Sequence, residues 1–187
     1  MAETQDLAPI EGLGLKVELE PRLHAASLRY FERGGVFTRM VHGVTGLSVP
    51  NDRGAAHSAD VARQDITILA WRSPSETTLL TTDDGLLHSL QTAAAALNDG
   101  CVVDQRGGTL VFRARGNEVA NLVARTAGHG AMPGIGESRR TRLAEVAVLI
   151  VKVQAEESLF VVDRIYAPHL MASIRVSAAD LNALPYN

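Results

Sequence analysis

The sequence has few aromatic residues and no excess of positive charge. Phe, Trp and Tyr make up 4% of its 187 residues, and the formal net charge is -3 at pH 7. Proteins that hold nucleic acid need a basic surface for the phosphates and often aromatic side chains on which bases stack. The composition therefore argues against nucleic acid as a partner.

Cysteine and long apolar runs are also scarce. Cys101 is the sole cysteine, which excludes an internal disulfide and a cysteine-rich metal site and suits a reducing compartment. The longest apolar run, Val146–Val151, is far shorter than the roughly 20 residues that span a bilayer. Residues 1–14 carry acids and Pro9 where a secretory signal has a basic patch and an apolar run. We expect a cytoplasmic protein with no membrane span.

The motifs of metal and nucleophile chemistry are missing as well. No H-x-x-x-H, H-E-x-x-H or G-x-S-x-G pattern occurs. Cys101 opens an apolar strand, where a buried thiol is usually inert. The histidines are spread singly: His24, His42, His57, His88, His129 and His169. A metal site is therefore not expected.

Two segments have the composition of an anion site. The glycine-rich stretch at 128–138 has a predicted helix before it and a predicted strand after it, the reverse of a dinucleotide-binding fingerprint, so a connecting loop is favoured. The densest cationic cluster is Arg139, Arg140 and Arg142. It is compatible with a cofactor tail or an acidic partner, but a solvated entry to a strand is the interpretation we favour.

What remains is the composition of a globular protein, with 46% hydrophobic and 21% charged residues. We expect an N-terminal arm over 1–34 and one domain over 35–187. The run GVFTRMV at 35–41 predicts a strand ending in a turn, and the polar stretch 50–63 predicts a surface loop. Strands at 66–72 and 76–82 flank Ser73-Pro74-Ser75, which predicts a hairpin.

Helices and further strands follow in a regular order. Asp83 and Asp84 are candidate N-caps of a helix over 85–98, and Asn117 is the candidate N-cap of a helix that ends near Gly128. Strands at 101–104 and 109–113 are predicted to pair about Gly107-Gly108. Strands at 143–154 and 159–164 then precede a helix over 167–184 with Pro168 in its first turn. Three strand-strand-helix units predict an α+β protein with antiparallel sheets and helices on one face.

The order of these pieces resembles a known family. The stretches ILAWRSPSETTLL at 68–80 and VVDQRGGTLVFRARGNEVANLVARTA at 102–127, with 142–153, 159–164 and 166–170, resemble the γ subunit of heterotetrameric sarcosine oxidase. The resemblance covers 35–178. Trp71-Arg72-Ser73 departs from the Leu-Gly more usual in the family, which leaves open whether the complex oxidises sarcosine or another N-methyl amine.

The resemblance implies a fold like part of the folate-binding aminomethyltransferase of the glycine cleavage system. It also implies larger α, β and δ partner subunits that carry FAD, FMN, NAD and tetrahydrofolate. The complex would oxidise an N-methyl amine to an imine and pass the one-carbon unit to tetrahydrofolate or release formaldehyde. This chain would stabilise the assembly.

No catalytic, cofactor-binding or metal-binding residue is carried over to this chain. The folate-using transferases rely on an acid in an upstream hairpin, and Asp52, Asp60 and Asp65 match no such position. Asp104 has no evident partner base, so a hydrogen-bonding role in a turn is expected.

Three functions stay open from the sequence. A non-catalytic subunit should expose apolar side chains for a partner, and a stand-alone folate-binding protein of the same fold needs an acid and a guanidinium in one pocket. A plain interaction module without redox partners is the third. The candidate partner contacts are Tyr30, Phe31, Trp71, Tyr166 and Tyr186.

Overall fold

A computed structural model describes residues 7–60 and 65–183 of the chain. The chain divides into two compact units. Unit 1 comprises residues 1–20, 108–135 and 139–187, and unit 2 comprises residues 21–107 and 136–138. Neither unit begins at residue 35, and each is assembled from separate stretches of the sequence.

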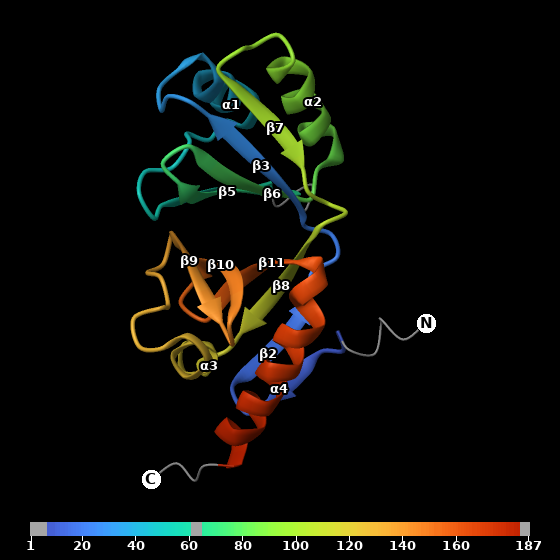
Figure 1. Cartoon of the computed structure of the whole chain (residues 1–187), viewed down its shortest axis with the longest axis vertical. Helices are drawn as coiled ribbons and strands as arrows, with labels where there is room; N and C mark the ends of the chain where they lie inside the picture. Colours follow the sequence, from blue (N-terminus) through green and yellow to red (C-terminus); the bar gives the residue numbers. More distant parts are fainter. Residues whose placement is uncertain (1–6, 61–64, 184–187) are drawn as a thin grey trace. The chain divides into compact units, whose positions relative to one another are not determined.

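Unit 1 is built on a six-stranded sheet in the order β1-β2-β8-β11-β10-β9, labelled in Figure 1. Its strands are β1 (Ile10–Gly12), β2 (Leu15–Leu19), β8 (Thr109–Arg115), β9 (Glu137–Leu143), β10 (Val146–Gln154) and β11 (Glu157–Asp163). Its helices are α3 (Val119–Ala127), the short 3-10 helix η1 (Arg164–Tyr166) and α4 (Ala167–Ala183). β2 pairs antiparallel with β8, and β8 pairs antiparallel with β11.

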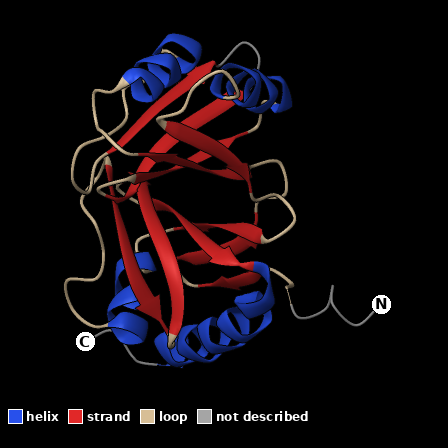
Figure 2. Cartoon of the chain, turned by 45° about the horizontal axis from the view of Figure 1, so that its top comes forward, coloured by secondary structure: helices blue, strands red, loops and turns tan. Residues whose placement is uncertain are grey.

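Helices α3 and α4 cover one face of this sheet. Because side chains alternate along a strand, β8 directs Phe112 and Ala114 to the core and Arg113 to the opposite face. Leu122 of α3 and Met171 of α4 belong to the same buried cluster as these strand residues. Unit 1 thus has one hydrophobic core between its helices and its sheet (Figure 2).

Unit 2 is built on a five-stranded antiparallel sheet in the order β4-β5-β6-β3-β7. Its strands are β3 (His24–Tyr30), β4 (Ala55–Asp60), β5 (Asp65–Ser73), β6 (Glu76–Thr81) and β7 (Gly100–Asp104), and its helices are α1 (Val36–Thr45) and α2 (Asp84–Ala94). Leu28, Leu69 and Leu79 of the strands share a second buried core with Phe37 of α1 and Leu90 of α2.

Several expectations from the sequence are confirmed. The fold is α+β, with two antiparallel sheets. The hairpin of β5 and β6 forms about residues 73–76. Asp83 caps α2, since its Oδ1 accepts hydrogen bonds from the backbone N–H groups of Gly85 (2.8 Å) and Leu86 (3.1 Å). Pro168 lies in the first turn of α4.

The segment at 35–41 is helical, and the strand predicted there is wrong. Gly35 is the N-cap of α1, and the backbone N–H of Phe37 donates to Oδ2 of Asp99 at 2.9 Å. Phe37 and Val41, one helical turn apart, are both fully buried in the core of unit 2. Tertiary packing of this face overrides the β propensity of Val, Phe and Thr.

The predicted pairing of 101–104 with 109–113 is also wrong. Both strands exist, but β7 pairs with β3 in unit 2, whereas β8 pairs with β2 and β11 in unit 1. The Gly107-Gly108 step is therefore the passage from one unit to the other and does not form a hairpin turn. Local spacing cannot reveal a partner strand that lies about 70 to 100 residues earlier in the chain.

Other segments are more ordered than expected. The range 1–34 expected to form an arm contains β1, β2 and β3, and β3 is an interior strand of its sheet. The predicted loop at 50–63 contains β4. α3 begins at Val119 after Glu118, two residues beyond Asn117, and has no side-chain cap.

Candidate functional site

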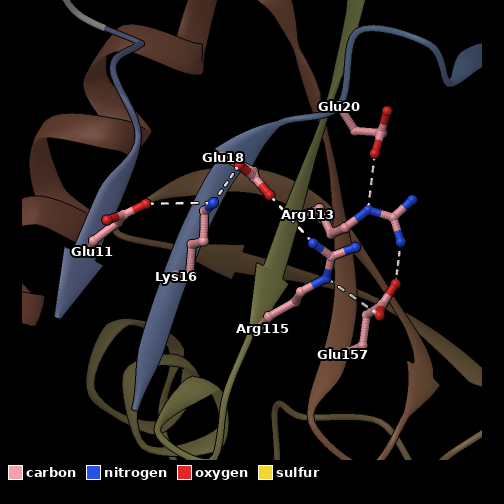
Figure 3. A network of polar contacts seen from close by, with 7 residues as sticks. All are labelled: Glu11, Lys16, Glu18, Glu20, Arg113, Arg115 and Glu157. Carbon is pink, nitrogen blue, oxygen red and sulfur yellow. Dashed lines mark hydrogen bonds and ion pairs between the residues drawn. The ribbon is translucent and has the colours of Figure 1, made fainter. Parts of the chain in front are cut away.

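A row of charged side chains lies on the sheet face of unit 1 opposite its helices (Figure 3). At its centre is Arg113 of β8, whose side chain is only 9% exposed. Its Nε donates to Oε2 of Glu20 at 3.0 Å, and its Nη1 pairs with Oε1 of Glu157 on the neighbouring strand β11. One guanidinium thus joins residues separated by 93 and 44 positions in the sequence.

The network continues toward the edge of the sheet. Arg115 bridges Glu157 of β11 (3.5 Å) and Glu18 of β2 (3.4 Å). Lys16 of β2 bridges Glu18 (3.0 Å) and Glu11 of β1 (3.4 Å). Four carboxylates and three cations give this network a formal charge of -1. Each side chain drawn in Figure 3 has an opposite charge beside it, so the network ties β1, β2, β8 and β11 together.

The protonation of Lys16 suits a structural role better than a catalytic one. The pKa of Lys16 is raised, first by its hydrogen bonds to Glu18 and Glu11 and then by their negative charges. A raised pKa keeps the amine in its ammonium form at neutral pH, in which it is neither a base nor a nucleophile.

Unit 2 carries a pocket of about 550 Å³ at one end of its sheet. The end of β3, the β5–β6 turn, the segment after α2 and the start of β7 form its wall. The lining residues are Arg29, Tyr30, Phe31, Ser75, Glu76, Leu97, Asn98, Gly100 and Cys101. An acid and a guanidinium thus lie in one pocket, as the alternative of a folate-binding protein requires.

The acid of this pocket is already engaged by its neighbours. Glu76 accepts a hydrogen bond from Oγ of Ser27 at 2.5 Å and lies 3.8 Å from Nε of Arg29 and 3.7 Å from Nε of Arg72. Two guanidinium groups share this one carboxylate, and of the two only Arg29 lines the pocket. The engaged carboxylate of Glu76 is therefore poorly placed for acid–base chemistry, and the exposed Arg29 is the group of the pocket that could meet an anion.

Asp104 has the structural role expected from the sequence. Its Oδ1 accepts a hydrogen bond from the backbone N–H of Arg106 at 2.9 Å, and its Oδ2 lies 2.7 Å from the Arg106 guanidinium. The side-chain hydrogen bond from Arg106 lowers the pKa of Asp104 below 3.8. The carboxylate is thus held ionised in a turn after β7, which is the expected hydrogen-bonding role.

The other residues singled out in the sequence do not converge on either feature. Arg139, Arg140 and Arg142 lie on the edge strand β9, where Arg140 and Arg142 are exposed and Arg142 pairs with Glu145 at 3.5 Å. Cys101 is exposed, so the expectation of a buried thiol is wrong. The neighbouring Val102 packs against the core of unit 2, so the alternation along β7 directs Cys101 to the opposite, exposed face.

The aromatic candidates for partner contacts divide into two groups. Phe31 is 87% exposed and Tyr166 is 48% exposed, whereas Tyr30 is buried in the core of unit 2 and Trp71 is half-buried. Tyr186 lies outside the described residues, as do the side chains of Asp60 and Asp65. Asp52 is exposed, 4.0 Å from Arg33.

The described residues hold neither a cluster of metal ligands nor a helix that could span a membrane. Over residues 7–60 and 65–183, no three His, Cys, Asp or Glu side chains gather as a metal site would require. No helix in these ranges has the length and apolar character needed to cross a bilayer.

Sequence reasoning missed both charged features. The signal for the network is present as alternating charges, with Lys16, Glu18 and Glu20 two residues apart and Arg113 and Arg115 likewise. Such alternation predicts a polar sheet face, but it does not say which strands are neighbours. Arg29 and Glu76 of the pocket are brought together by the pairing of β3 with β6 and have no sequence motif.

The chain resembles known proteins in structure and not in sequence. No protein-family model matches the sequence, and no curated protein matches it. Among solved structures, a chain of heterotetrameric sarcosine oxidase from Corynebacterium sp. U-96, in complex with pyrrole 2-carboxylate, superposes with a TM-score of 0.82 at 18% identity. The match covers 100% of this chain and 94% of that one. The chain shares the fold of that sarcosine oxidase chain.

A second structure with a related fold is an aminomethyltransferase. Glycine cleavage system aminomethyltransferase T from Bartonella henselae superposes with a TM-score of 0.63 at 11% identity over 92% of this chain. The chain spans 47% of the length of that aminomethyltransferase. The resemblance expected from the sequence is thus confirmed at the level of the fold.

Proposed function

We propose that this chain is a small, non-catalytic γ-type subunit of a sarcosine oxidase-like complex, which oxidatively demethylates sarcosine or a related N-methyl amine. The observation that carries the proposal is the extent of the structural match. The chain accounts for 94% of one chain of a heterotetrameric enzyme but for only 47% of the aminomethyltransferase. It therefore has the size of a whole subunit and about half the size of the folate enzyme.

In this proposal the cofactors belong to the larger α, β and δ subunits. These partners carry FAD, FMN, NAD and tetrahydrofolate, in the cytoplasm. The role of this chain is to stabilise their assembly. Two features support that role. The seven charged groups of the network in unit 1 are paired with one another, and large apolar side chains such as Phe31, Ile165 and Leu13 are exposed as a partner surface requires.

Purification of the tagged chain from its native host tests the proposal. We expect larger polypeptides to accompany it, with the visible absorption of an oxidised flavin. Addition of sarcosine or another N-methyl amine should bleach that absorption, whereas glycine, which lacks the methyl group, should not. A colourless chain without partners would contradict the proposal.

A stand-alone folate-binding protein is the second candidate. The observations in its favour are the aminomethyltransferase-like fold and the pocket that holds Arg29 beside Glu76. Calorimetric titration of the purified chain with 5-formyltetrahydrofolate distinguishes the two. Binding that Arg29→Ala abolishes, in a chain that purifies alone, would favour the folate-binding protein over the subunit.

A further inference from the structure

The sheet of unit 2 ends in an unpaired edge. β7 is the last strand of the order, and among the described residues it pairs only with β3. The backbone N–H of Phe31 donates to the carbonyl oxygen of Asp99 (3.2 Å), and that of Gln105 donates to the carbonyl oxygen of Ala25 (3.0 Å). Hydrogen-bonded and non-hydrogen-bonded residue pairs alternate along antiparallel strands, so these two bonds show which residues of β7 bond to β3. The backbone groups of Cys101 and Val103 therefore face β3, and those of Gly100, Val102 and Asp104 point away from the sheet.

This edge lacks several of the features that usually prevent strand addition. The sequence of β7, GCVVD, contains no Lys and no Pro, and its register with β3 runs through five successive pairs without a bulge. Cys101 and Val103 are exposed. An edge of this kind offers hydrogen-bonding groups and apolar side chains to an incoming strand.

The pocket opens where this strand begins. Gly100 and Cys101 line it together with the exposed Phe31 and with Arg29, the cross-strand neighbour of Cys101. The Arg29 side chain is 59% exposed and is, among the described residues, the one cation that lines the pocket, where it lies 3.8 Å from Glu76. The pocket can take an apolar side chain against Phe31 and a carboxylate at Arg29.

We propose that an extended segment of a partner subunit adds to unit 2 as a strand along β7. Its backbone pairs with Val102 and Asp104, one apolar side chain enters the pocket, and an adjacent Asp or Glu meets Arg29. The proposal rests on the proposed function, since it assigns the surface by which this chain holds a larger subunit. Backbone pairing supplies the affinity, and the pocket selects an acidic and apolar sequence.

Val102→Pro removes the outward N–H that the incoming strand needs. Proline is tolerated on an edge strand where the N–H faces solvent, so the pairing of β7 with β3 is retained. Phe31→Ser, at a side chain that is 87% exposed, removes the pocket wall without touching the core. Val176→Ser on α4 of unit 1, 65% exposed, is the matched control. Far-UV circular dichroism verifies the fold of each variant.

The measurement compares the free chain with the complex that co-purifies with it, by hydrogen exchange and by the yield of each variant. We expect the amides of Val102 and Asp104 to exchange about tenfold or more slowly in the complex. We also expect Val102→Pro and Phe31→Ser to lose the partner and Val176→Ser to keep it.

Two results would contradict the docking proposal, and only one of them would also contradict the proposed function as a subunit. A complex with flavin in which these amides exchange as in the free chain would leave the subunit function standing. A chain that purifies without partners, either as a monomer or as a dimer that Val102→Pro dissociates, would contradict both the docking proposal and the subunit function.

Discussion

Arg113 is the residue on which the sheet of unit 1 depends most. Its side chain is nearly buried between two carboxylates that are 14% and 19% exposed, and it links β2, β8 and β11. Removal of one member of a buried ion pair costs more than the pair contributes, because the remaining charges lose their compensation. The neighbouring Arg115 has similar partners but a side chain that is 49% exposed.

We therefore predict a large difference between two arginine variants. Arg113→Ala should lower the free energy of unfolding by about 3 kcal/mol, since Glu20 and Glu157 lose the cation between them. Arg115→Ala should cost less than about 1 kcal/mol, because its ion pairs are exposed to solvent. Urea denaturation measures both. Equal effects would show that burial does not set the strength of the network.

Asp104 gives a prediction for acid pH. Its pKa lies below 3.8 because Arg106 hydrogen-bonds the ionised form, so the native state binds fewer protons than the unfolded state. The stabilisation is fully present above the unfolded pKa and is lost as the pH falls through the lower folded pKa. Asp104→Asn should flatten the decrease of the urea midpoint as the pH falls below about 4. Asp52→Asn controls for charge removal, and a decrease as steep as in the wild type would contradict the assignment.

At the scale of the element, two glycines of unit 2 have opposite significance. Gly100 opens β7, and a Cβ built there would lie 2.4 Å from the ring of Phe37 and 2.7 Å from the carbonyl oxygen of Arg29. Gly43 lies inside α1, and a Cβ there would meet nothing within 4 Å. Packing requires glycine at position 100, whereas Gly43 weakens helix α1.

The two alanine variants should accordingly change stability in opposite directions. Gly100→Ala should destabilise by about 1–3 kcal/mol through overpacking against Phe37. Gly43→Ala should stabilise by about 0.5–1 kcal/mol, because it lowers the backbone entropy lost in the helix. Thermal unfolding of the two variants checks both signs. A stabilising Gly100→Ala would mean that the contact of β7 with α1 is looser than described.

The elements show where sequence reasoning succeeds. The hairpin of β5 and β6, the cap at Asp83 and helix α4 follow from turn residues and periodicity, which act within a few residues. α1 was missed because the burial of Phe37 and its bond to Asp99 come from residues about 60 positions away. The pocket was missed for the same reason, since Arg29 and Glu76 meet only through the pairing of β3 with β6.

At the scale of the whole molecule, the two units share strand β9. Its first two residues, Glu137 and Ser138, belong to unit 2, and residues 139–143 belong to unit 1. Ser138 donates from Oγ to the carbonyl oxygen of Trp71 at 2.8 Å and from its backbone N–H to that of Arg53 at 2.6 Å. Because β9 has residues in both units, we expect loss of structure in one unit to disturb the other.

This coupling predicts that damage to unit 1 is felt in unit 2. Trp71 is the only tryptophan and lies in unit 2, so its fluorescence follows that unit. Unfolding of unit 1 frees β9 and removes the hydrogen bonds of Ser138. We expect Arg113→Ala to lower the urea midpoint reported by Trp71 as well as that reported by far-UV circular dichroism. An unchanged fluorescence midpoint would show that the units unfold independently.

The pairing of β2 with β8 has a consequence for synthesis on the ribosome. Glu20 at the end of β2 and Arg113 of β8 are 93 residues apart, and nearly all of unit 2 is encoded between them. At about 5–20 residues per second, β2 leaves the ribosome roughly 5–20 s before its partner exists. During that interval the nascent chain can complete the hairpins of unit 2, while the β1–β2 hairpin lacks its partner strand β8. A chaperone that binds nascent chains would find its target in these first strands.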